Sequence, residues 1–216
     1  MLGVKRGSLG HYSVLLLGVL SLSLLDLACK KKTDDTAAAT IADTVGTWKS
    51  ACVTFGGVDV QLTLVNTVSS GVYSYARTTD TYSASSSCAT AAKLWTTAEA
   101  GTYTVGDTSG AGYALDTTLT SITLTPSAAG AVAFKQACTA IATAAGVAST
   151  ATFTAGTATD LKSDVCNTNV KIAPYQILKI QDSKLYFGDT TVTGQKGLTT
   201  ATRTQELASA VPFTKQ

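Results

Sequence analysis

Hydrophobic and polar residues alternate most clearly in residues 58–64, where every second side chain from Val58 onward is apolar. This period of two is typical of a strand with one face on a core. An apolar stretch that begins at Trp48 and ends before Gly56-Gly57 predicts a preceding strand, and residues 72–76 predict a following one. Residues 45–78 are therefore expected to form a three-stranded antiparallel meander.

Further strands are expected along the rest of the chain. They cover residues 93–97, 101–105, 115–124, 175–180 and 184–187. Within residues 115–124 the apolar positions change from odd to even numbers, as an extra residue in a β-bulge would produce, so we expect a bend near Thr120-Ser121. Asp182-Ser183 fits a tight hairpin between the last two strands.

One helix is expected in this strand-rich pattern. Ser127 follows a proline and is a good cap for a helix over residues 128–145, with Gly146 as its end. An apolar stripe on that helix is expected to face inward; its members are Phe134, Cys138, Ile141 and Ala145. Such a helix either closes a barrel end or forms a lid or a lipid-touching element. The polar tail after Gly188 is expected to wrap the surface, with Phe213 buried.

Composition favours the same fold class and excludes one function class. Thr, Ser, Ala and Gly dominate after residue 28, and the recurring β-branched residues favour strands. We expect a single all-β domain over residues 45–216, mainly an antiparallel barrel or sandwich with one short helix inserted. The formal net charge is +2 and only 14% of residues are charged, so no nucleic-acid partner is expected.

The first 28 residues have the layout of a signal peptide. Lys5 and Arg6 precede an uncharged apolar stretch over residues 13–25, and Ala28 directly precedes Cys29. Crossing a bilayer as a helix takes about 20 apolar residues, so this stretch is too short for a permanent transmembrane helix.

The run Leu25-Asp26-Leu27-Ala28-Cys29 resembles the lipobox of bacterial lipoproteins, with Asp26 where that family usually carries Leu. The resemblance implies cleavage after residue 28, a diacylglyceryl group on Cys29, and membrane lipid as a partner. Residues 29–44 would then be a lipidated N-terminus and flexible tether. Lys30 after that Cys resembles the sorting signal for the outer membrane, which implies the periplasmic face or the cell surface. The alternative is ordinary secretion with cleavage after Ala39.

The other four cysteines form an even set in an exported chain, and they predict two disulfides. They are Cys52, Cys88, Cys138 and Cys166. Four cysteines allow three connectivities, and we favour Cys52–Cys88 with Cys138–Cys166 because each pair is nearest in sequence. The alternative, a metal cluster, lacks a close Cys-x-x-Cys pair, and no metal or cofactor is expected.

Two short runs resemble known families. Gly46-Thr47-Trp48 resembles the opening of lipocalins and fatty-acid-binding proteins, which implies a lipocalin-like barrel with Trp48 at its floor and with Arg203 packed over that Trp. The run Lys184-Leu185-Tyr186-Phe187-Gly188-Asp189-Thr190 resembles small uncharacterised bacterial lipoproteins. Aromatic residues that either line a ligand cleft or belong to the core are Trp48, Tyr73, Tyr75, Trp95 and Tyr103.

Catalysis is not expected. The only histidine, His11, lies in the signal peptide, so a mature chain lacks the imidazole of the common hydrolase designs. Asp160 and Asp164 flank Lys162 without the spacing of a calcium loop. The sequence thus predicts a membrane-anchored envelope lipoprotein that binds a small apolar ligand or displays a surface to envelope proteins. The alternatives are a carboxylate-based enzyme, such as a glycan hydrolase, and a surface adhesin.

Overall fold

The computed structural model describes residues 40–55, 57–149, 151–166 and 173–216. The predicted signal peptide and Cys29 lie outside the described residues, as does the predicted tether as far as residue 39. The strands of the first half are β1 (Gly46–Ser50), β2 (Val53–Phe55), β3 (Val58–Ser69), β4 (Val72–Tyr82), β5 (Lys93–Ser109) and β6 (Gly112–Pro126). After α1 (Ala128–Ala144) come β7 (Thr159–Asp160), β8 (Tyr175–Gln181), β9 (Lys184–Phe187) and β10 (Phe213–Lys215). Short 3₁₀ helices are η1 (Ile41–Thr44), η2 (Thr90–Ala92) and η4 (Thr200–Thr202).

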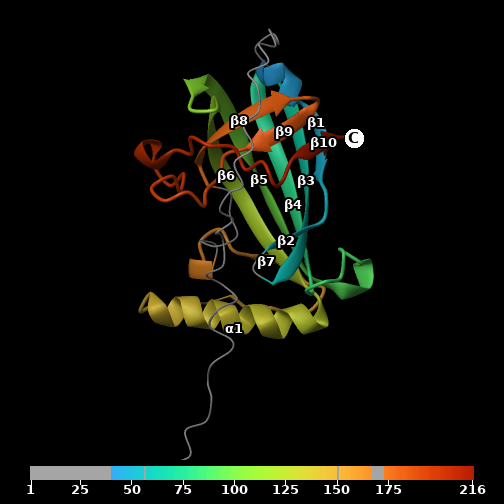
Figure 1. Cartoon of the computed structure of the whole chain (residues 1–216). Helices are drawn as coiled ribbons and strands as arrows, with labels where there is room; N and C mark the ends of the chain where they lie inside the picture. The colour runs from blue at the N-terminus through green and yellow to red at the C-terminus, as the bar shows by residue number, and fades with distance from the viewer. Residues whose placement is uncertain (1–39, 56, 150, 167–172) are drawn as a thin grey trace, which may run out of the picture.

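Eight of these strands form a closed antiparallel barrel, in the order β1, β3, β4, β5, β6, β8, β9 and β10 (Figure 1). Neighbours along the chain are mostly neighbours in the sheet, and β1 closes the ring by pairing with both β3 and β10. The short strands β2 and β7 extend the sheet beside β3 and β6. The fold is therefore a barrel rather than a sandwich, with a single α-helix among the described residues, as the sequence predicts.

Several predicted elements differ in their bounds. The two strands expected over residues 93–105 are one strand, β5, and the stretch expected as a single first strand is divided into β1 and β2. The 3₁₀ helix η1 directly precedes β1, and its last residue, Thr44, is buried. Phe213 is buried as expected, but within β10, so the end of the chain completes the barrel instead of only wrapping it.

The predicted bulge lies in β6. Ala100 pairs with Ser121 and Gly101 with Leu119, so Thr120 is the extra residue, and its hydroxyl donates to the Ala100 carbonyl at 2.9 Å. The bend lets Leu119 and Ile122 both face the interior, although one is odd and the other even. The phase change in the sequence therefore marked a real irregularity in the strand.

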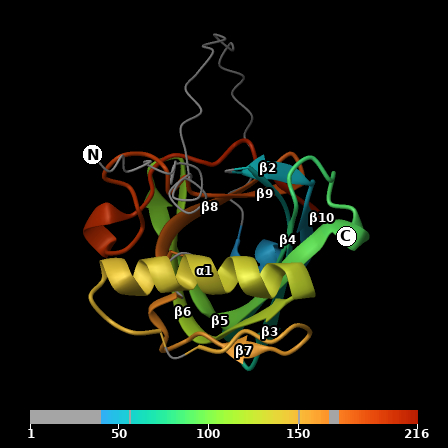
Figure 2. The same cartoon turned by 90° about the horizontal axis from the view of Figure 1, so that it is seen from below.

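Helix α1 lies across one end of the barrel, and η1 lies at the other (Figures 1 and 2). The Ser127 hydroxyl accepts a hydrogen bond from the Gly130 amide at 3.2 Å, as expected of a helix cap. The buried face of α1 follows a spacing of four residues and consists of Gly130, Phe134, Cys138 and Ala142. The predicted stripe is therefore wrong at its far end, where Ala145 is exposed. No helix of the described residues is long and apolar enough to cross a membrane.

The four described cysteines form the two disulfides favoured from the sequence, Cys52–Cys88 and Cys138–Cys166. The first joins the break between β1 and β2 to the loop after β4. The second ties α1 to the loop that follows β7. Cross-links over 36 and 28 residues each contribute on the order of 3 to 4 kcal/mol in the chain-entropy model.

Candidate functional site

The barrel interior holds two apolar clusters, one at each end. The cluster near η1 includes Trp48, Leu64, Tyr103 and Phe213, and the cluster under α1 includes Ile122 and Phe134. The inner face of β5 shows how they are separated, because Thr97 and Glu99 lie between Trp95 of one cluster and Tyr103 of the other. A polar layer therefore crosses the middle of the barrel.

Glu99 is the centre of this polar layer. Its side chain is 0% exposed, and it lies directly opposite Arg77 on β4. One carboxylate oxygen accepts a hydrogen bond from the Arg77 guanidinium at 2.6 Å, and the other accepts one from the Tyr75 hydroxyl at 2.8 Å. The Arg77 side chain is 16% exposed, so water reaches the cation but not the carboxylate.

Tyr75 connects the polar layer to the cluster near η1. Gly101 makes room for its ring, because a Cβ on Gly101 would lie 2.6 Å from the ring and 2.2 Å from the Thr118 carbonyl oxygen. Burial, reinforced by the negative charge of Glu99, raises the pKa of the Tyr75 phenol far above its ordinary value. The hydroxyl therefore remains a hydrogen-bond donor to Glu99 at any physiological pH.

The helix η1 closes the barrel end through Thr44. The Thr44 carbonyl accepts hydrogen bonds from the Trp48 indole at 2.8 Å and from the Asn66 amide at 3.0 Å. The Thr44 hydroxyl lies 2.7 Å from the Tyr103 hydroxyl. Burial raises the pKa of the Tyr103 phenol, so this contact also persists at neutral pH. Residues from three strands thus hold a segment that the sequence assigns to a tether.

Trp48 lies at the barrel floor, as the lipocalin resemblance implies, but its cationic neighbour is a different residue. The Lys215 ammonium lies 5.3 Å from the centre of the indole. Arg203 instead forms an ion pair with Asp116 and lies 5.6 Å from the centre of the Tyr175 ring. The expectation for Arg203 is therefore wrong, because the chain supplies its final strand after that residue and β10 places Lys215 opposite Trp48.

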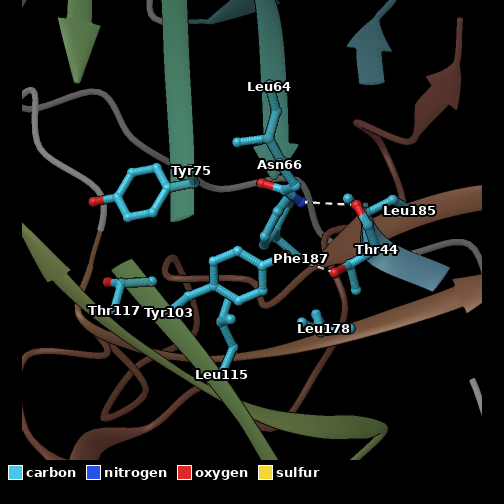
Figure 3. Close-up of a pocket in the computed structure, with 10 residues that line it drawn as sticks. All are labelled: Thr44, Leu64, Asn66, Tyr75, Tyr103, Leu115, Thr117, Leu178, Leu185 and Phe187. Atoms are coloured by element: carbon cyan, nitrogen blue, oxygen red, sulfur yellow. Dashed lines mark hydrogen bonds between the residues drawn. The ribbon is translucent and has the colours of Figure 1, made fainter. Parts of the chain in front are cut away.

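A small cavity lies inside the barrel beside Thr44 (Figure 3). Four leucines and Phe187 make its apolar wall, Tyr75 and Tyr103 lie at its sides, and Asn66 and Thr117 add polar atoms. The volume open to the centres of water-sized spheres is about 20 Å³. On that measure one water needs roughly 10 to 15 Å³, so the cavity has room for about one water molecule.

The five aromatic candidates do not form one binding cleft. Tyr75 and Tyr103 line the cavity, whereas Trp48 belongs to the floor and Tyr73 packs beside Tyr103 with ring centres 5.7 Å apart. Trp95 lies in the other cluster, 5.5 Å from the Phe134 ring. Most of the set therefore belongs to the core, which is the second of the two interpretations that the sequence allows.

Sequence reasoning missed three residues of the interior: Asn66, Arg77 and Glu99. Asn66 continues the even-numbered inner face of β3 beyond Leu64, so the period of two already marked its position. Arg77 and Glu99 are visible only once β4 and β5 are placed in register. No pattern within a single strand reveals that pair.

One group of possible metal ligands lies beneath α1. Single ligand atoms of Cys138, Cys166 and Asp164 lie within 4.8 Å of one another. The two sulfurs are bonded to each other, so the group offers a disulfide and one carboxylate instead of thiolate ligands. The Ser149 hydroxyl donates to Asp164 at 3.2 Å, and the Cys166 amide donates to the same carboxylate at 2.9 Å. Asp164 therefore organises the loop around the disulfide.

The second buried carboxylate, Asp59, points to the outside of β3 and holds a loop. It accepts hydrogen bonds from the Thr54 hydroxyl at 2.7 Å, the Ser87 amide at 2.8 Å and the Ser86 hydroxyl at 3.2 Å. The Thr54 hydrogen bond, followed by those from Ser87 and Ser86, lowers the pKa of Asp59 below its usual 3.8. The loop after β4 is thus fixed both by Cys88 and by this carboxylate.

Acid is expected to weaken the Asp59 contacts. A carboxylate whose pKa is lower in the folded than in the unfolded state stabilises the fold at any pH above its unfolded pKa. That stabilisation is lost as the pH falls through the folded-state pKa. Unfolding in urea at pH 7 and at pH 3 should show a smaller acid-induced loss for Asp59→Asn than for the wild type. Thr54→Val should give an intermediate result. An equal acid-induced loss in all three proteins would contradict this role for Asp59.

No family model matches the sequence, and no curated protein matches it.

Proposed function

We propose that this protein is a non-enzymatic lipoprotein of the bacterial envelope, anchored by lipid on Cys29, that acts through the outer surface of its barrel on another envelope component. The observation that carries the proposal is the filled interior. The barrel ends are covered by η1 and α1, and the cavity has only about 20 Å³ for the centres of water-sized spheres. Pockets for organic ligands usually measure several hundred Å³. Contact through the outer wall therefore suits this barrel better than carriage of a lipid.

The carboxylates of the described residues support the non-enzymatic part of the proposal. Glycan hydrolases need two carboxyl groups that face one cleft, about 5 to 9.5 Å apart. The two buried ones here, Asp59 and Glu99, lie on opposite faces of the barrel wall, and each is held by structural neighbours. Neither has the setting of a general acid.

The middle of the outer wall offers an uncharged surface to a partner. Outward positions near the middle of the neighbouring strands β4, β5 and β6 are Ala, Ser and Thr, while the charged Asp80 and Asp116 lie nearer the strand ends; the small residues include Ala76, Ala98, Ala100, Thr102, Thr118 and Ser121. Such a wall suits binding by shape and hydrogen bonds rather than by charge. If the partner lies outside the cell, the protein would be an adhesin.

Small-ligand binding is the second candidate, and the apolar cavity with the Asn66 and Thr117 side chains at its wall favours it. Its occupant would have to be very small, or side chains such as Phe187 would have to move. A carrier would hold a small molecule noncovalently, and that molecule would be detected when it dissociates. A surface-binding protein would instead release a protein partner.

Native mass spectrometry after gentle extraction from the membrane tests both candidates. We expect a covalent lipid mass that Cys29→Ala lacks, a gain of two hydrogens per disulfide on reduction, and no bound apolar molecule. Phe187→Ala, which enlarges the cavity, is the positive control for apolar binding. A wild-type protein without the lipid mass would refute the anchor, and an apolar ligand retained by Cys29→Ala would make the protein a carrier.

A further inference from the structure

Three tight turns lie at the same end of the barrel as η1. These are Ser70-Gly71 between β3 and β4, Gly110-Ala111 between β5 and β6, and Asp182-Ser183 between β8 and β9. The three turns share one end because neighbouring strands around the ring are antiparallel. The helix η1 lies at the same end because it precedes Gly46, which pairs with Asn66 near the end of β3. Helix α1 covers the opposite end (Figure 1).

The β3–β4 turn presents apolar side chains to the solvent. Val72 is 55% exposed and Val68 is 46% exposed, on either side of a turn in which Ser70 and Gly71 both have positive φ. The paired strands hold these valines in place, since Val68 pairs with Tyr73 and Ser69 with Val72. Exposure alone does not distinguish the two ends, because Val132 on α1 is 62% exposed.

The position of the anchor distinguishes them. Cys29 precedes Thr40, the first described residue, by 40 − 29 = 11 residues, and 11 residues span at most about 40 Å when fully extended. The 12 residues of β3, tilted as barrel strands are, rise by roughly 30 Å, and α1 adds about 10 Å. The α1 end would therefore face the membrane only with the connecting chain stretched to its limit.

We propose that the η1 end of the barrel rests on the head-group layer of the membrane, with Val68 and Val72 inserted at its surface. This inference rests on the proposed anchor at Cys29. Charge contributes little to the contact, because three aspartates and three lysines near this end balance; they are Asp43, Asp107, Asp182, Lys179, Lys184 and Lys215. The lysines that follow the anchor, Lys30-Lys31-Lys32, add positive charge toward anionic head groups.

Single tryptophans at three exposed sites test this orientation. Val72→Trp probes the β3–β4 turn, Val132→Trp the α1 end, and Thr118→Trp the outer wall. The four described disulfide cysteines leave Cys29 as the one free thiol of the five cysteines. The chain that begins at Cys29 is therefore coupled to a maleimide phospholipid in vesicles of phosphatidylethanolamine and phosphatidylglycerol, with brominated acyl chains as quenchers.

Val72→Trp is expected to lose roughly half of its added emission to brominated chains, as an indole at the interface would. Val132→Trp and Thr118→Trp should keep theirs. Stronger quenching of Val132→Trp than of Val72→Trp would mean that the α1 end faces the membrane, and stronger quenching of Thr118→Trp would mean that the barrel lies on its side. No quenching at any of the three sites would mean that the barrel does not touch the membrane. Each of these results overturns the proposal. Because the coupling bypasses cellular lipidation, these results are independent of whether cells attach lipid to Cys29.

Discussion

Replacing Glu99 with Gln is expected to lower the free energy of unfolding by about 3 to 5 kcal/mol, the usual cost of removing one partner from a buried ion pair. The substitution keeps the size of the side chain and the acceptor for Tyr75. It places an amide against the Arg77 guanidinium, which now makes a 2.6 Å contact with the carboxylate. Urea unfolding followed by circular dichroism measures the change.

Two controls separate the ion pair from other causes of the loss. Arg77→Met combined with Glu99→Met removes both charges, and it should recover most of the stability, apart from about 1 to 3 kcal/mol for the Tyr75 hydroxyl that loses its acceptor. Asp80→Asn breaks the more exposed pair with Lys93 on the outside of the same wall, and should cost less than about 1 kcal/mol. A Glu99→Gln protein as stable as the wild type would show that the polar layer does not hold the barrel together.

The Glu99 pair also shows where prediction from the sequence stopped. The sequence pattern predicts two separate strands here, over residues 93–97 and 101–105, with Glu99 in the gap between them. In the barrel they continue as β5, since Arg77 on the next strand neutralises the carboxylate. The pairing of β4 with β5 therefore determines that this stretch is one strand, and the sequence of β5 alone does not show that pairing.

Local signals predicted more. The alternation in β3, the Ser127 cap and the phase change at Thr120 each depend on neighbouring residues, and each has its counterpart in the structure. The closure of the ring by β10 and the placement of Lys215 over Trp48 depend on residues more than 160 positions apart (215 − 48 = 167). Those features required the topology.

For one substitution in helix α1, Gly130→Ala, helix propensity and tertiary packing predict opposite changes in the free energy of unfolding. Gly130 lies in the first turn of the helix, where Ala normally stabilises by up to about 1 kcal/mol. A Cβ on Gly130 would lie 1.9 Å from the Leu94 carbonyl oxygen of β5. The same carbonyl accepts a hydrogen bond from the Ser127 amide at 2.7 Å, so the strand and the helix start are locked together.

Gly130→Ala is therefore expected to destabilise the protein, by about 3 kcal/mol on the scale of overpacked cores. The helix would have to move away from β5, which would loosen Phe134 against Trp95 and shift the Trp95 fluorescence. The Cys138–Cys166 disulfide would keep α1 attached, so the helical circular dichroism should remain. Ala129→Gly on the exposed side of the same turn is the matched control, with a loss of about 1 kcal/mol. An equal or higher stability of Gly130→Ala would mean that α1 does not approach β5 as closely as described, and that this barrel end is open enough to admit a ligand.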